Sequence, residues 1–118
     1  MKVQRGDVVF LRFPFSDGSG SKVRPAVVVQ RDIDNQRLDS TVVMLITGNK
    51  TLVGKEPGHI LIDIGSEDGK SSGLGFNSVV NVHALFTLHT NQIREVIGSL
   101  SASLMSLVDQ QLRLSLDL

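Results

Sequence analysis

Residues 24–47 read RPAVVVQRDIDNQRLDSTVVMLIT, a stretch that contains two almost continuously apolar runs. The first run extends from Ala26 to Gln30 and the second from Thr41 to Thr47. Strands that are buried on both faces have continuous hydrophobic sequences, whereas half-exposed strands alternate. We therefore expect two buried strands that are neighbours in the middle of a sheet, joined by a polar turn over residues 32–39.

Shorter runs rich in β-branched residues flank this stretch, and turn-forming residues separate them. They predict further strands over residues 8–13, 59–64, 78–82, 85–88 and 93–97. His83 and Ala84 fall between two of these runs, so we expect a bend or bulge there. Residues 16–21 and 65–75 are rich in glycine and serine, which indicates exposed or flexible loops.

The period of the apolar residues changes near the C-terminus. Helical spacing relates four of them, namely Leu104, Leu107, Val108 and Leu112. This spacing predicts an amphipathic helix whose first turn is capped by Ser99 or Ser101. The 118 residues suit one domain over 1–118, mainly β, folded as a barrel or sandwich that is followed by one helix.

The charge of the chain is balanced but unevenly distributed. Twelve Lys and Arg stand against twelve Asp and Glu, so the formal net charge is zero. Residues 1–55 contain nine basic and five acidic side chains, a net of +4, whereas residues 56–118 contain three and seven, a net of −4. The zero total argues against a protein that holds nucleic acid by bulk charge. It is compatible with a small site formed around one guanidinium.

The absence of cysteine excludes disulfides, thiolate metal sites and a cysteine nucleophile. The three histidines, at positions 59, 83 and 89, lack the spacing of a zinc hydrolase motif. The carboxylates Asp63, Glu67 and Asp68 lack the alternating spacing of a calcium loop, so we interpret them as solvated. We expect no metal and no cofactor. No targeting segment and no run of membrane-spanning length is present, which favours a cytoplasmic protein.

Arg24 and Thr47 are polar residues at the ends of the two buried runs. If the strands pair antiparallel, as a short connection favours, the start of one meets the end of the other and these side chains lie side by side. In a parallel arrangement they lie at opposite edges. A guanidinium beside a hydroxyl suits a phosphodiester, because Arg binds phosphate through two N–H groups and stabilises a pentavalent state. The competing interpretation is a surface cation and an ordinary strand-end residue.

Four other positions allow both a functional and a structural interpretation. His83 could act as general base or acid, although a solitary His is more often structural. Phe13 and Phe15 could stack on bases or pack in the core. Lys22 could steer a phosphate backbone or be solvated.

Several segments in a fixed order carry a resemblance to a known family. They are Gly6-Asp7-Val8-Val9, Lys22 to Val29 with its Arg-Pro-Ala-Val-Val core, the strand ending in Thr47, and Ile97-Gly98-Ser99-Leu100-Ser101 before the helix. From about residue 6 to about residue 116 the chain resembles the MazF/PemK-like toxins of bacterial type II toxin–antitoxin modules. The resemblance implies an SH3-like barrel of the MazF/PemK/CcdB type with a C-terminal helix, a homodimer, and a MazE/PemI-like cognate antitoxin. It also implies a metal-independent, sequence-specific endoribonuclease (mRNA interferase) that cleaves single-stranded RNA.

The resemblance also implies roles for individual residues. In the family the 2′-hydroxyl attacks the adjacent phosphate and leaves a 2′,3′-cyclic phosphate and a 5′-hydroxyl. The essential Arg before the Pro falls on Arg24, which would stabilise the phosphorane, and the essential Thr or Ser falls on Thr47, which would hold the phosphate. The loop that closes over RNA corresponds to residues 15–22, which implies RNA contacts from Phe15, Ser16, Asp17 and Lys22.

One segment departs from the family pattern. Relatives carry an acidic residue followed by Gln after the Ser-Val-Val strand, whereas this chain has Asn81-Val82-His83-Ala84. His83 would then replace a carboxylate as general base. Two alternatives remain open: a toxin of the same fold that poisons gyrase by protein binding, and a catalytically degenerate module that only binds partners.

Overall fold

The computed structural model describes residues 2–14, 21–49 and 58–118. Its strands are β1 (Asp7–Pro14), β2 (Ser21–Val28), β3 (Ser40–Thr47), β4 (His59–Ile62), β5 (Ser78–His89) and β6 (Ile93–Ser99). Its helices are α1 (Asp32–Arg37) and α2 (Ala102–Leu116), with short 3-10 turns at Lys70–Ser72 and Thr90–Gln92. The predicted strands are confirmed with three differences: residues 78–82 and 85–88 form one long strand, β4 ends at Ile62, and β2 extends from Ser21 to Val28 rather than from Ala26 to Gln30.

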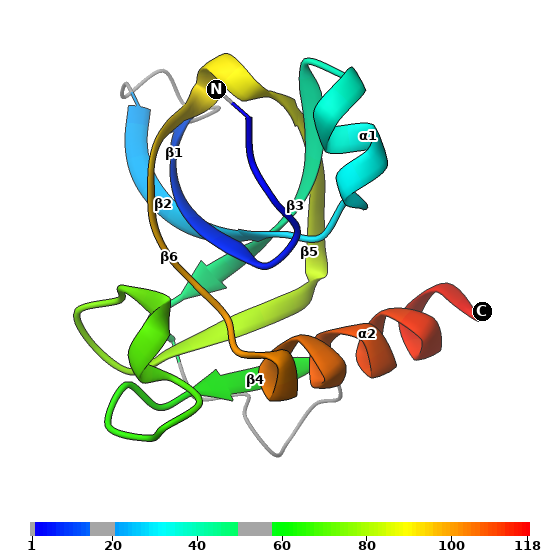
Figure 1. The fold of residues 1–118 in the computed structure, drawn as a ribbon. Helices are drawn as coiled ribbons and strands as arrows, with labels where there is room; N and C mark the ends of the chain where they lie inside the picture. Colours follow the sequence, from blue (N-terminus) through cyan, green and yellow to red (C-terminus); the bar gives the residue numbers. More distant parts are fainter. Residues whose placement is uncertain (1, 15–20, 50–57) are drawn as a thin grey trace.

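The six strands form one antiparallel sheet in the order β4-β5-β3-β2-β1-β6. The strands curve around one another as a barrel, and α2 crosses beside β4 (Figure 1). The expected β barrel with a C-terminal helix is therefore confirmed. The two strands from the opening stretch, β2 and β3, are adjacent in the centre of the sheet, as predicted.

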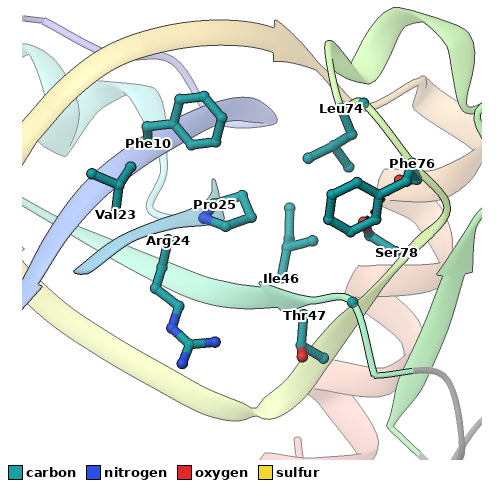
Figure 2. Close-up of a pocket in the computed structure, with 11 residues that line it drawn as sticks. Phe10, Val23, Arg24, Pro25, Ile46, Thr47, Leu74, Phe76 and Ser78 are labelled. Carbon is teal, nitrogen blue, oxygen red and sulfur yellow. Dashed lines mark hydrogen bonds between the residues drawn. The ribbon is translucent and has the colours of Figure 1, made fainter.

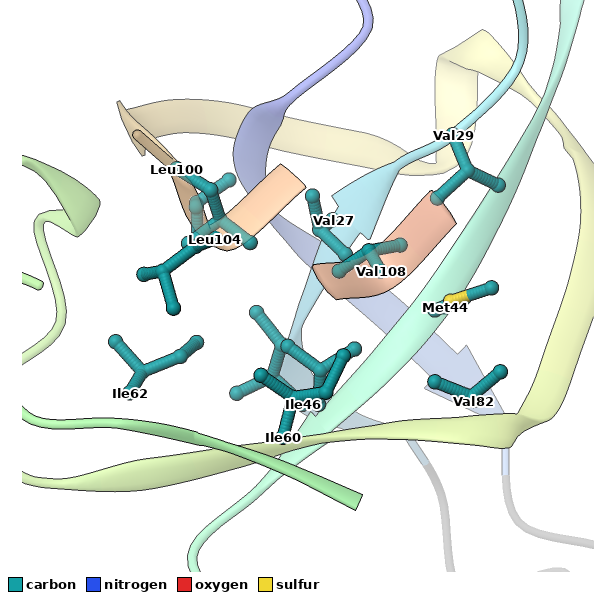
Figure 3. Packing of buried hydrophobic residues seen from close by; sticks show 12 residues of the cluster. Val27, Val29, Met44, Ile46, Ile60, Ile62, Val82, Leu100, Leu104 and Val108 are labelled. Carbon is teal, nitrogen blue, oxygen red and sulfur yellow. The ribbon is translucent and has the colours of Figure 1, made fainter. Parts of the chain in front are cut away.

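The apolar run at the end of β2, from Ala26 to Val28, is buried on both faces of the sheet. Val27 belongs to a cluster that includes Leu104 and Val108 of α2, and Figure 3 shows this cluster. Ala26 and Val28 belong to a second cluster with Val9, Leu11, Val43 and Ile93. Successive side chains of a strand point to opposite faces, so each cluster takes alternate residues of the same run.

Helix α2 begins as the sequence predicts. Ser101 is its N-cap, and the Ser101 hydroxyl accepts a hydrogen bond from the Leu104 N–H at 3.1 Å. Leu104 and Val108 are buried, and burial of each such side chain contributes about 1.5–3 kcal/mol. Arg5 attaches the helix to the N-terminal segment through a 2.6 Å contact with Asp109. Across the described part of the chain, no helix has the length and apolar character needed to cross a membrane.

The prediction of a polar turn over residues 32–39 is wrong, because residues 32–37 form α1. The Asn35 side chain is only 2% exposed and donates to the Gln30 carbonyl at 2.8 Å. The Asn35 side-chain oxygen accepts from the Thr41 hydroxyl at 2.8 Å. A hydrogen bond from Arg31 is the main cause that lowers the pKa of Asp34 in this helix. The helix therefore depends on side chains outside its own segment.

Residues 65–75 make more contacts with the rest of the fold than the glycine-rich sequence predicts. The Ser66 hydroxyl donates to the Asp63 carbonyl at 2.6 Å, and Ser72 is fully buried. At Gly73 the backbone has φ +76, and a Cβ there would collide with the Ile97 carbonyl of β6. The segment packs closely against β6, so it forms part of the barrel wall rather than a loop without tertiary contacts.

Substituting Gly73 by Ala should therefore destabilise the fold. We expect Gly73→Ala to lower the free energy of unfolding by at least about 2 kcal/mol, because it adds backbone strain and a clash with β6. Gly75→Ala is the matched control, since Gly75 has no atom within 4 Å of a Cβ position and no positive φ. Its change should stay within about 0.5 kcal/mol. Urea unfolding followed by far-UV circular dichroism measures both, and equal midpoints would contradict the expectation.

Candidate functional site

The pairing of β2 with β3 determines where Arg24 and Thr47 lie. The strands are antiparallel, with Ala26 opposite Leu45. The same register continued by two residues places Arg24 opposite Thr47. The hydrogen-bonded pairing ends before this point because Pro25 has no N–H to donate. Of the two arrangements considered from the sequence, the antiparallel one is therefore correct.

Arg24 and Thr47 line the same pocket, which has a volume of about 350 Å³. Figure 2 shows Phe10, Val23 and Pro25 on one side of this pocket and Leu74, Phe76 and Ser78 on the other, with Ile46 between them. The walls are largely apolar, and the polar groups come from the ends of the two buried strands. We call it the Arg24–Thr47 pocket.

The Arg24 side chain is half-buried, and its guanidinium has no hydrogen bond or ion pair with any residue that the structure describes. Other cations behave differently: Arg5, Arg31, Arg37 and Lys70 each contact a carboxylate. None of the described residues that line the pocket is acidic. The pocket therefore presents a positive charge whose N–H donors are not used by any described residue and suit an anion.

The Thr47 hydroxyl is held in place by the backbone two residues further along the chain. Its oxygen accepts a hydrogen bond from the Asn49 N–H at 3.2 Å. A hydroxyl also carries one proton that it can donate. No residue in the described part of the chain accepts that proton. Thr47 can therefore donate to an oxygen of a bound anion without losing its own support.

His83 lies elsewhere. The register between β3 and β5 shifts, so residues 81–84 form a bulge, and His83 is exposed. His83 lines a separate pocket of about 150 Å³ together with Gly58 and residues of α2, and its ring contacts His59 edge to face at 5.8 Å. The predicted bulge is confirmed. Within one chain the two pockets share no residue, so the structure does not bring His83 together with Arg24 and Thr47.

Four predicted RNA contacts are not placed by the structure. Phe15, Ser16 and Asp17 lie outside the described residues. Lys22 belongs to β2, where its backbone pairs with Phe13, but its side chain is outside what the structure describes. All four therefore remain predictions.

The carboxylates near the glycine-rich segment are exposed, as expected. Lys70 pairs with Glu67 at 2.7 Å, and the Ser101 hydroxyl donates to Asp68 at 3.2 Å. Asp63 accepts a hydrogen bond from the Gly65 N–H at 2.9 Å. Within residues 2–14, 21–49 and 58–118, no three His, Asp or Glu side chains are grouped so that they could hold a metal ion.

Sequence reasoning missed the opposite wall of the pocket, which Leu74, Phe76 and Ser78 form. Their proximity to Arg24 follows from the pairing of β3 with β5, in which Thr47 lies opposite Val79. The run Ser78-Val79-Val80 predicts a strand but does not indicate its partner. This wall therefore could not be found without the sheet order.

Comparison with known proteins agrees with this arrangement. The family model for the PemK-like, MazF-like toxin of type II toxin-antitoxin systems matches residues 4–116. Endoribonuclease MazF6 of Mycobacterium tuberculosis is 31% identical over 119 residues, which cover 100% of both chains. Endoribonuclease EndoA of Bacillus subtilis is 32% identical over 119 residues, which cover 100% of this chain and 97% of EndoA.

A solved structure of MazE-MazF (Form-III) from Deinococcus radiodurans has the same fold. Its TM-score is 0.79 at 19% identity, and the match covers 100% of this chain and 99% of that chain. The family match extends over almost the whole sequence and includes both Arg24 and Thr47. The chain belongs to the family of PemK-like, MazF-like toxins of type II toxin–antitoxin systems.

Proposed function

We propose that this toxin is an endoribonuclease that cleaves single-stranded RNA at a phosphate bound between Arg24 and Thr47. One observation carries the proposal: a guanidinium that pairs with no described residue and a supported hydroxyl line the same pocket. The names of MazF6 and EndoA, both endoribonucleases, support the reaction class.

Arg24 supplies the charge that the reaction needs. A guanidinium binds two phosphate oxygens through parallel N–H groups, and it keeps its proton at any physiological pH. Arg24 therefore stabilises the pentavalent phosphate rather than donating a proton. The apolar walls of the pocket strengthen this attraction, because they exclude part of the water that would screen it.

Thr47 orients the phosphate. Because the Asn49 N–H occupies an acceptor position of the hydroxyl, its proton points elsewhere and can reach a non-bridging oxygen. A donor fixed before the substrate arrives costs little reorganisation in the transition state.

The bond changes follow the family chemistry. The 2′-oxygen forms a bond to phosphorus, the bond from phosphorus to the 5′-oxygen breaks, and a 2′,3′-cyclic phosphate and a 5′-hydroxyl result. The described residues that line the pocket include no carboxylate and no imidazole. In the proposal the 2′-hydroxyl proton therefore passes to water, and water returns a proton to the 5′-oxygen.

Partners and location complete the proposal. MazF of D. radiodurans has been solved as MazE-MazF, which supports a MazE-like antitoxin as partner of this chain. We also expect a homodimer, a cytoplasmic location where RNA is available, and RNA contacts from the loop residues Phe15, Ser16, Asp17 and Lys22.

Substitutions of Arg24 and Thr47 should lower the rate of RNA cleavage while the protein remains folded. Arg24→Ala should lower kcat/KM for single-stranded RNA by about 10²-fold or more, since it removes the charge that stabilises the transition state. Thr47→Val should lower it by about tenfold or more, and Thr47→Ser should retain most activity. Arg94→Ala is the control, because Arg94 is exposed on β6 and does not line the pocket. Undiminished cleavage by a folded Arg24→Ala protein would refute the proposal.

The substrate itself provides a second test. Replacing the ribose on the 5′ side of the cleaved bond by 2′-deoxyribose should abolish cleavage, because the attacking oxygen is then missing. EDTA should leave the rate unchanged, since the positive charge comes from Arg24. Mass spectrometry of the products should find a 2′,3′-cyclic phosphate. Cleavage of the deoxy-substituted RNA, or loss of activity in EDTA, would rule out this chemistry.

His83 provides a third test. Because His83 lines the other pocket, His83→Ala should keep kcat/KM within about twofold of the original protein, with the same pH dependence. Rates measured between pH 5 and 8 check this expectation. If the variant loses an acidic limb that the original protein has, His83 acts as the general base after all.

A further inference from the structure

Phe76 is an exposed aromatic ring at the wall of the Arg24–Thr47 pocket. Its side chain is 67% exposed, although a phenyl ring gains stability from burial. Aromatic residues are scarce in this chain, which has five Phe and neither Trp nor Tyr. Phe76 contributes little to the core, so its position requires another explanation.

The ring rests on Gly48, the residue that follows Thr47. A Cβ at position 48 would lie 3.1 Å from the Cε2 atom of Phe76, closer than side chains normally approach. Gly48 does not have the positive φ that favours glycine at Gly58 or Gly73. Its missing side chain therefore leaves space for the phenyl ring directly beside the Thr47 backbone.

The segment that carries Phe76 is firmly held. The Ser78 hydroxyl donates to the Phe76 carbonyl at 2.9 Å, and the Asn77 side chain accepts from the Ile64 N–H at 2.9 Å. The preceding residues pack against β6 at Gly73. Figure 2 shows Phe76 across the pocket from Phe10, with Thr47 below them. A ring on such a support loses little conformational freedom when a ligand covers it.

We propose that Phe76 is the stacking platform for the base of a nucleotide that flanks the cleaved phosphate. The inference rests on the proposed function, since Arg24 and Thr47 must hold the phosphate next to the ring. Nucleic-acid bases all have a π face, and aromatic side chains of proteins that bind single strands use it. Phe76 then positions the nucleotide and contributes to the choice of the cleaved bond, while Arg24 and Thr47 act on the phosphate.

A double-mutant cycle, in which Phe76 is changed in the protein and one base is removed from the RNA, tests the stacking. The cleaved sequence is first found by sequencing the ends of a digested transcript, and a short oligoribonucleotide containing it is made with an abasic site on either side of the bond. Phe76→Ala should lower kcat/KM by about tenfold on the complete RNA. The original protein should cut one of the abasic RNAs about tenfold more slowly than the complete RNA. Phe76→Ala should cut that abasic RNA about as fast as it cuts the complete RNA.

Two further variants separate stacking from a structural role. Phe76→Trp should keep the activity, because it keeps the aromatic face, whereas Phe76→Leu should behave like Phe76→Ala. Ile33→Ala is the matched control, since Ile33 is also 67% exposed but lies on α1, outside the pocket. Circular dichroism confirms that each variant is folded.

The Phe76→Trp protein also reports binding directly, because the chain has no other Trp and no Tyr. Its fluorescence should be quenched by the oligoribonucleotide carrying the non-cleavable 2′-deoxy substitution, and the abasic version should quench less. Ile33→Trp should show no change with either RNA.

The outcomes distinguish the two proposals. If Arg24→Ala is inactive but Phe76→Ala cuts the complete RNA at the original rate, the stacking proposal is overturned and the proposed function stands. Equal losses from the abasic site in the original protein and in Phe76→Ala overturn it as well, because the ring and the base then act independently. If Arg24→Ala retains full activity, the proposed function fails first.

Discussion

The antiparallel pairing of β2 with β3 is the constraint on which the rest of the structure depends. Successive residues in the apolar runs of both strands belong alternately to the two core clusters, so a slip of one residue would move each side chain into the other cluster. The same register places the start of β2 beside the end of β3. The packing of the core therefore also fixes Arg24 beside Thr47, and the site needs no dedicated scaffold.

Arg24 differs from four other cations of the chain because no carboxylate among the described residues pairs with it. Arg5, Arg31, Arg37 and Lys70 are each neutralised by a carboxylate, whereas the described lining around Arg24 contains none. A protein of zero net charge can therefore still have a positively charged binding pocket. The +4 half of the sequence contains Arg24, and specific binding of one phosphate needs no wide basic surface.

The bulge in β5 divides the surface of the barrel into two separate regions. Val79 and Val80 stay paired with the end of β3, and the preceding Ser78 lines the Arg24–Thr47 pocket. The bulged residues 81–84 turn His83 toward α2. One strand thus contributes to two pockets, and a histidine that is close in sequence to Ser78 belongs to the other one. The packed segment 65–77 then completes the first pocket with Phe76.

The sequence by itself determined most of the strands, an N-cap at Ser99 or Ser101, the family, and Arg24 and Thr47 as a pair that antiparallel strands would bring together. These features depend on local periodicity, capping chemistry and two strands that are near neighbours along the chain. Only the tertiary structure decided the helix α1, the location of His83 and the exposure of Phe76 beside Gly48. Each of these features depends on contacts between residues far apart in the sequence or on a shift of strand register. The local pattern of polar and apolar residues predicts neither such contacts nor such a shift.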